Sequence, residues 1–199
     1  MNAIKVPGRA TVPFDSKYAT NETRQPRAVE YNEWDIESLT DLIVKQYHFN
    51  AKADVRVIYD LAHKAFCRHS EKHPELAKLV EALFLFFDDL LFHLKQEEQI
   101  LFPNIIQLNE KKVHERSFNY STFGVIKEYA ITMQNEHKDV VKQLEFFRRL
   151  TNDYRPPEDG SILCQSLFLR MKEFESDMMQ HILLENDVLF PKAIQMDEN

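Results

Sequence analysis

Glycine is scarce in this chain, with only 3 glycines among 199 residues. Sheet proteins use glycine in their tight turns, so this scarcity favours long helices with few connections. Cysteine is also scarce: Cys67 and Cys164 lie far apart and form no CxxC pair. A disulfide framework is therefore not expected, and a reducing compartment is indicated.

Long apolar runs are missing as well. No stretch reaches the ~18 apolar residues of a membrane span, and residues 1–27 contain no apolar run long enough for a signal peptide. The net charge of -7 disfavours nucleic acid as the main partner. We therefore expect a cytoplasmic protein that contacts neither membrane nor nucleic acid.

The chain divides into an arm and a domain. Residues 1–33 carry Pro7, Pro13 and Pro26 without hydrophobic periodicity, which predicts an N-terminal arm, either flexible or docked on the domain or on a neighbouring subunit. Residues 34–196 are helical in pattern, and with 44% hydrophobic residues in the chain they can bury a real core.

Four long helices are predicted in this domain. The first is capped by Asp35 or Ser38 and runs to about residue 69. The second covers about 75–102 and ends at Pro103, the third covers about 125–150, and the fourth covers about 161–190 and ends at Pro191. Mostly short connections make neighbours antiparallel, so the predicted fold is an all-α, up-down-up-down four-helix bundle.

Two segments of the chain repeat. Residues 93–103 read HLKQEEQILFP and residues 181–191 read HILLENDVLFP, so both have the form H-x3-E-x3-L-F-P. Shifting His48 by the same 88 residues gives position 136, one short of His137. The domain is therefore expected to consist of two helical hairpins, each with one His on its first helix and a His-x3-Glu on its second.

The 3-4 spacing of the inner seam of a bundle passes through these polar residues. Most seam positions are apolar, such as Val44, Leu83, Phe86, Ile100 and Phe174. The exceptions stand where a leucine is expected, and they are our candidate metal ligands: His48, His93, Glu97, His137, His181 and Glu185.

Buried carboxylates and imidazoles need partners. These six could pair with one another, but a metal accepts lone pairs from all of them at once. The absence of cysteine on the seam disfavours a thiolate zinc site, and the donor set suits Fe, Mn or Zn. Six ligands fit two metals bridged by the two Glu carboxylates, with an oxo or hydroxo bridge and open positions for small ligands.

The other histidines are not expected to be ligands. His63, His73 and His114 fall off the seam or in loops. His69 lies on the first helix's seam, but 21 residues from His48 correspond to roughly 31 Å along a helix. Tyr47 and Glu136, each next to a candidate ligand in sequence, are the nearest residues that could tune the site.

The motifs LIVKQYH, HSEKHPEL, KQEEQILFP, NEHKDV, LTNDYRPPEDG and HILLENDVLFP occur in this order. At these residues the chain resembles the hemerythrin-type (HHE) cation-binding domain, and in particular the RIC (repair of iron centres) proteins of the YtfE and ScdA type. The resemblance covers about residues 34–195. It implies a di-iron centre held by His48, His93, His137 and His181, with Glu97 and Glu185 as bridges.

The resemblance also implies a function: repair or protection of iron–sulfur clusters under nitrosative or oxidative stress, with NO, O2 or peroxide as small reactants. A non-enzymatic O2 or NO sensor or carrier is the alternative, because the same ligands support both. A metal-free bundle with an internal His/Glu network is a third reading. Such family members usually begin with a small domain that carries adjacent cysteines, which residues 1–33 lack. A homodimer or a protein partner is left open.

Overall fold

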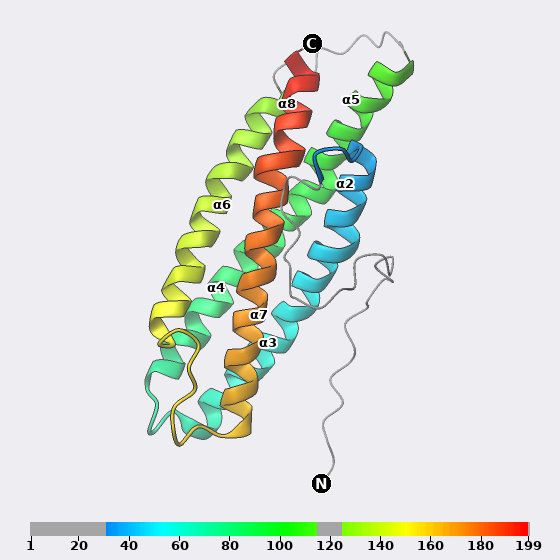
Figure 1. The fold of residues 1–199 in the computed structure, drawn as a ribbon. Helices are drawn as coiled ribbons and strands as arrows, with labels where there is room; N and C mark the ends of the chain where they lie inside the picture. The colour runs from blue at the N-terminus through cyan, green and yellow to red at the C-terminus, as the bar shows by residue number, and fades with distance from the viewer. Residues whose placement is uncertain (1–30, 115–124, 199) are drawn as a thin grey trace, which may run out of the picture.

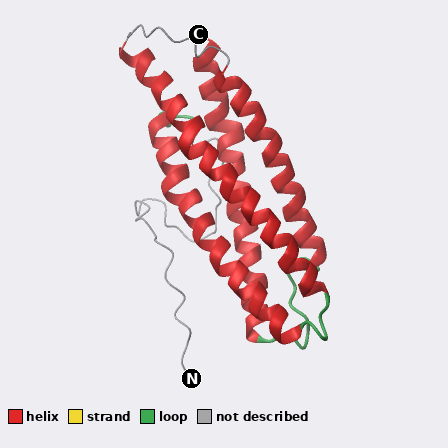
Figure 2. Cartoon of the chain, turned by 180° about the vertical axis from the view of Figure 1, so that it is seen from behind, coloured by secondary structure: helices red, strands yellow, loops and turns green. Residues whose placement is uncertain are grey.

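The computed structural model describes residues 31–114 and 125–198 of the chain, and within these ranges the regular elements are all helical (Figure 1). They form four long rods, residues 36–69, 75–114, 125–150 and 162–198 in chain order, which run side by side in Figure 2. The elements in chain order are α2 (Ile36–Leu42), η2 (Ile43–His48), α3 (Phe49–His69), α4 (Glu75–Gln96), η3 (Glu97–Leu101), α5 (Phe102–His114), α6 (Val125–Leu150), α7 (Ile162–Leu184), η4 (Glu185–Leu189) and α8 (Phe190–Glu198), where η marks a π-helical turn.

Local sequence signals place the starts of the helices. Asp35 caps α2, because its carboxylate accepts the backbone N–H of Ser38 at 2.8 Å. The second rod begins at Glu75 directly after Pro74, and the fourth begins after the loop that follows Thr151. Of the two predicted caps, Asp35 and Ser38, the structure has Asp35, and the predicted third helix, 125–150, is confirmed.

The four rods pack as an antiparallel bundle. α3 lies against α4 and α7, and α4 lies against α6, as Figure 1 shows. Consecutive rods therefore run in opposite directions, and the predicted all-α, up-down-up-down bundle is confirmed. In the described part of the chain, no helix is both long enough and apolar enough to cross a membrane.

Two predicted helix ends are wrong. The second rod passes Pro103 and continues to His114, and the fourth passes Pro191 and continues to Glu198. Each proline follows a π-helical turn in which an N–H donates five residues back: Phe102 to the Glu97 carbonyl, and Phe190 to the Glu185 carbonyl. The wider turn accommodates the pyrrolidine ring, which would collide with the preceding turn of an ordinary α-helix.

The same π turns shift the seam by one residue. Ile100 and Val44 were expected in the core, but Ile100 is exposed and Val44 is only half-buried, whereas Leu101 and Ile43 are buried. A π turn holds more residues than an α turn, so 3-4 spacing counted across it arrives one position off. Seam residues away from the π turns, such as Leu83 and Phe174, are buried as predicted.

The core has two apolar parts with a polar layer between them. We call the part next to the Ser70–Pro74 turn the loop-end cluster; it includes Leu79, Leu83, Phe86, Phe147 and Phe174. The other part surrounds α2, α5 and α8. The six candidate ligands, at least one from each rod, lie between the two apolar parts. We call these six residues the His/Glu layer.

The predicted N-terminal arm lies largely outside the described residues. Of residues 1–33 only Tyr31–Glu33 are described; Tyr31 is buried, and Lys192 of α8 donates to the backbone oxygens of Asn32 and Trp34, both at 2.7 Å. The arm between 1 and 30 and the connection 115–124 stay predictions.

Candidate metal centre

All six predicted ligands converge in the bundle core. His48 ends η2, Glu97 begins η3, and Glu185 begins η4, while His93, His137 and His181 lie in α4, α6 and α7. Each of the six side chains is buried. Two groups of them could hold a metal ion: His48, Glu97, His181 and Glu185 in one, and His93, Glu97 and His137 in the other.

The four imidazoles form two pairs. The Nε2 atoms of His48 and His181 lie 3.0 Å apart, and those of His93 and His137 lie 3.1 Å apart. We call the first the inner pair. The second is the groove pair, because His93 lines the groove described below.

Both carboxylates reach both pairs. Glu97 places Oε2 at 3.4 Å from His48 Nε2 and Oε1 at 3.4 Å from His93 Nε2. Glu185 places Oε1 at 2.9 Å from His181 Nε2 and Oε2 at 3.2 Å from His137 Nε2. Each carboxylate thus presents one oxygen to each pair, which is the arrangement expected of a bridge between two cations.

The outward-facing nitrogens decide which way the lone pairs point. His48 Nδ1 lies 2.8 Å from Glu98 Oε1, His93 Nδ1 lies 2.7 Å from Glu136 Oε2, and His137 Nδ1 lies 2.9 Å from Asn186 Oδ1. These oxygens only accept, so the three Nδ1 atoms donate. In the neutral imidazoles Nε2 then carries a lone pair that points into the layer.

At three of its four imidazoles the layer consequently lacks a donor. At the groove pair two imidazole lone pairs face carboxylate oxygens, and both oxygens of Glu97 and Oε2 of Glu185 have no hydrogen-bond partner among the described residues. Burying a carboxylate without a partner costs several kcal/mol, because the charge loses its hydration and gains no compensating interaction. One cation at each pair would satisfy all of these atoms, so the residues fit a metal centre.

The pKa values of the metal-free layer also indicate that its carboxylates favour positive charge beside them. Burial by itself lowers the pKa of His48, but Glu185 and Glu98 outweigh it and raise that pKa to about 9. Burial is likewise outweighed at His137, where Glu185 and Glu97 raise the pKa to about 10. The surrounding imidazoles, His181 foremost, overcome burial and hold the pKa of Glu185 well below its usual value. Without metal, protons are drawn to the positions that metals would take.

The repeated motif now has a physical reading. In each hairpin the Glu enters the layer, and the residue after it accepts from the first-helix histidine: Glu98 from His48, and Asn186 from His137. The Phe of the L-F-P segment stacks on that same histidine, with Phe102 at 5.7 Å from His48 and Phe190 at 5.9 Å from His137. One motif thus supplies a carboxylate, an acceptor and a packing surface.

Some of the surrounding residues were predicted and some were missed. Glu136 bonds to His93, and Tyr47 stacks on His181 at 5.8 Å, in line with their expected proximity to the layer. Glu98, Asn186 and Lys52 were missed. The signal for the first two was present, because each directly follows a Glu of the repeated motif.

The other histidines lie elsewhere. His69 is at the far end of α3, where its Nε2 lies 2.9 Å from Ser161 Oγ. His63 is exposed, and His73 lies between Glu75 and Asp159. The side chain of His114 is outside the described residues. None of those described belongs to a group that could hold a metal.

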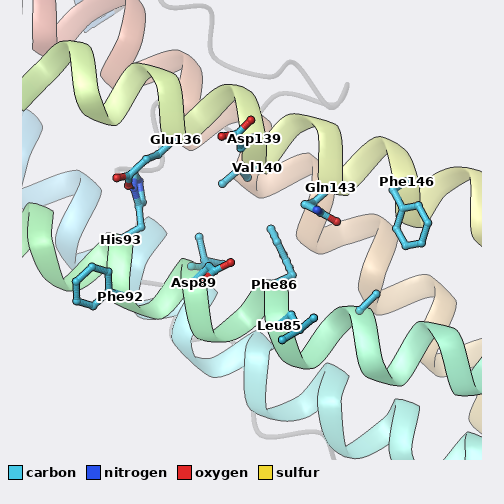
Figure 3. A pocket seen from close by; sticks show the side chains of 12 residues that line it. Leu85, Phe86, Asp89, Phe92, His93, Glu136, Asp139, Val140, Gln143 and Phe146 are labelled. Atoms are coloured by element: carbon cyan, nitrogen blue, oxygen red, sulfur yellow. The ribbon is translucent and has the colours of Figure 1, made fainter.

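A groove of about 600 Å³ runs between α4 and α6 and reaches the layer at His93 and Glu136 (Figure 3). Its walls include Phe86, Phe92 and Phe146, with Asp89 and Asp139 along its length. His93 is the most exposed of the six residues of the His/Glu layer, although only 6% of its side chain is exposed.

Comparison with known proteins gives a consistent relationship. The model of the hemerythrin HHE cation binding domain matches residues 43–193. The iron-sulfur cluster repair protein YtfE of Dickeya chrysanthemi is 32% identical over 166 residues, covering 82% of this chain and 69% of that protein. The protein of the same description from Yersinia pseudotuberculosis is 29% identical over 195 residues, covering 96% and 82%.

The matched range contains all six residues of the His/Glu layer and both copies of the repeated motif. The fold, the repeat and the comparisons agree: this chain belongs to the hemerythrin HHE cation-binding domain family and is similar to the YtfE iron-sulfur cluster repair proteins.

Proposed function

We propose that this chain is a di-iron protein that repairs iron–sulfur clusters after nitrosative or oxidative damage. In this proposal His48, His93, Glu97, His137, His181 and Glu185 hold two iron ions, with Glu97 and Glu185 contacting both. The observation that carries it is the position of Glu97. Its two carboxylate oxygens are buried and have no hydrogen-bond partner among the described residues, and each faces a different pair of imidazoles.

Iron is favoured over the other candidates by the donors and by the relatives. Four imidazoles and two carboxylates suit iron, manganese or zinc, and no thiolate is available, because Cys164 lies in the loop-end cluster and Cys67 is exposed. The YtfE relatives are named for iron-sulfur cluster repair, which supports iron. We assign the role to the cytoplasm, where free thiols such as these stay reduced.

Iron ions bound here would supply one-electron chemistry and positions for small ligands such as NO, O2 or peroxide. The side chains of the protein orient the imidazoles and exclude water from the layer. Glu98, Glu136 and Asn186 hold three imidazoles with their lone pairs inward. Phe102 and Phe190 cover two of the rings. The layer lies between the two apolar parts of the core, and among the described residues its buried titratable groups are the six proposed ligands.

A repair assay tests the proposal. A purified [4Fe–4S] protein is treated with NO until its cluster absorbance is lost, and the iron-loaded chain is then added. We expect the cluster absorbance to return with the wild type and with His63→Ala, which changes an exposed histidine of α3. It should not return with His181→Ala. Reversible binding of NO or O2 without any cluster recovery would contradict repair and favour the sensor or carrier alternative.

A further inference from the structure

The two imidazole pairs differ in what surrounds them, although the repeat makes them equivalent in position. The residues after the two Glu ligands are Glu98 and Asn186, one charged and one neutral. The residues before the two first-helix histidines are Tyr47 and Glu136. Glu136 bonds to His93, whereas Tyr47 stacks on His181, whose Nδ1 has no partner among the described residues.

These partners give the pairs different charges. At the inner pair Glu98 is neutralised, because Lys52 Nζ lies 2.6 and 2.7 Å from its two oxygens. At the groove pair Glu136 forms no ion pair within the described part of the chain other than the one with His93. Asp89 and Asp177 stand one turn before His93 and His181, so they add a carboxylate to both sides. The surplus negative charge therefore lies beside the groove pair.

Solvent access points the same way. The groove opens beside His93 and Glu136, as Figure 3 shows, while the side chain of His48 is 0% exposed and that of His181 is 1% exposed. A more highly charged cation is better stabilised next to water and next to an unneutralised carboxylate. A less charged cation is better tolerated in the closed half, near the Lys52 ammonium.

We propose that Glu136 is a positioning residue that makes the iron at His93 and His137 the first to be oxidised. This inference rests on the proposed di-iron centre. When one equivalent of ferricyanide takes one electron from the di-ferrous protein, the ferric ion is the one held by the groove pair. The iron at His48 and His181 stays ferrous, the electron leaves as ferrocyanide, and no bond to a protein atom forms or breaks.

A potentiometric titration of the iron-loaded protein tests this, with optical and electron paramagnetic resonance readouts of the two one-electron steps. Glu136→Gln keeps the hydrogen bond to His93 but removes the charge. It should raise the potential of the first oxidation and leave the second nearly unchanged. We expect at least a tenfold fall in the comproportionation constant, which is about 59 mV for a one-electron couple.

Lys52→Met makes an independent test from the other side. It leaves Glu98 without its cation, so the second oxidation should become easier and the two steps should again approach each other. Asp139→Asn is the matched control. Asp139 lines the groove but is paired with Lys142 and contacts no ligand, so both potentials should stay at their wild-type values.

The proposal is overturned if Glu136→Gln shifts both steps equally, shifts only the second, or shifts neither. If Glu136→Gln does not retain two irons, the Lys52→Met variant decides. A smaller difference between its two oxidation potentials supports the proposal, and an unchanged or larger difference overturns it. Iron content separates the two levels of inference. A wild type with fewer than two irons defeats the di-iron centre, whereas two irons with an unaltered separation in the variants defeat only the role of Glu136.

Discussion

The loop-end cluster and the His/Glu layer are built by the same four rods with the same inward spacing. One is filled with side chains such as Leu83, Phe86 and Phe147, and the other with four imidazoles and two carboxylates. The apolar side chains of the cluster need only van der Waals contact, and they provide it to one another. The layer leaves lone pairs and carboxylate oxygens unmatched. The loop-end cluster therefore contributes stability without any cation, whereas the layer needs cations to satisfy its polar atoms if it is the proposed metal centre.

Shortening one side chain in each region should give the largest difference between the two regions. Leu83→Ala opens a cavity in the loop-end cluster and should lower the free energy of unfolding by about 2–5 kcal/mol, with the metal content unchanged. Glu97→Ala removes a carboxylate that needs metal, so the metal-free variant should lose less stability than Leu83→Ala does. Urea unfolding of both metal-free variants makes the comparison. A greater loss for Glu97→Ala would contradict it.

Metal removal should act on the layer alone. A ligand that binds only the folded state stabilises it by roughly 2.7 kcal/mol when its free concentration is 100 times its Kd. Chelation should therefore lower the melting temperature, and adding metal back should restore it. The helical circular dichroism at 20 °C should persist, because the loop-end cluster holds the rods together without metal. Loss of the helical signal on chelation would show that the two regions are not separable.

Asn186 tests whether the acceptors behind the ligands matter. Asn186→Ala leaves His137 Nδ1 without its acceptor at 2.9 Å, so the ring is less firmly oriented and a weaker donor. We expect metal affinity to fall by about 10- to 100-fold, measured by competition with a chromophoric chelator. Asn135→Ala, at an exposed position of α6, is the control and should not change the affinity.

The pH dependence should separate the metal-free from the loaded protein. The folded-state pKa values of His48 and His137, about 9 and about 10, lie above the unfolded value of 6.5. Their contribution to stability is therefore fully present below pH 6.5 and is lost as the pH rises through 9 to 10. Metal requires the unprotonated imidazoles, so its stabilisation grows over the same interval.

Melting temperatures at pH 6.5, 8 and 9.5 measure this effect. The difference between loaded and metal-free protein should widen with pH, because the metal-free protein becomes less stable while the loaded one does not. A metal-free protein whose melting temperature is constant or rises across this range would contradict the assigned contacts between the imidazoles and the carboxylates.

The sequence predicted the bundle because helical periodicity, caps and scarce glycine are all local signals. It also identified the six residues of the layer, since a polar side chain on an apolar seam stands out, and the repeat related the two hairpins. The predictions from sequence failed where the α-helix changes into a π-helical turn. Ile100 and Val44 were misplaced, and Pro103 and Pro191 were read as ends, because π turns carry no spacing signal of their own.

Tertiary contacts account for the remaining omissions. Glu98 and Lys52 lie 46 residues apart, and their bond depends on the packing of α3 against the second rod. The groove beside His93 is lined by residues of both α4 and α6, so it depends on how these two helices pack. Neither follows from one helix's periodicity.

Iron content per chain is the most direct test of the central claim. The wild type, His63→Ala and Glu97→Ala are loaded anaerobically with ferrous iron, desalted and analysed for metal and protein. If Glu97 and Glu185 each serve both imidazole pairs, the wild type and His63→Ala hold two irons per chain and Glu97→Ala holds at most one. One iron or fewer in the wild type, or two irons retained by Glu97→Ala, would contradict the account.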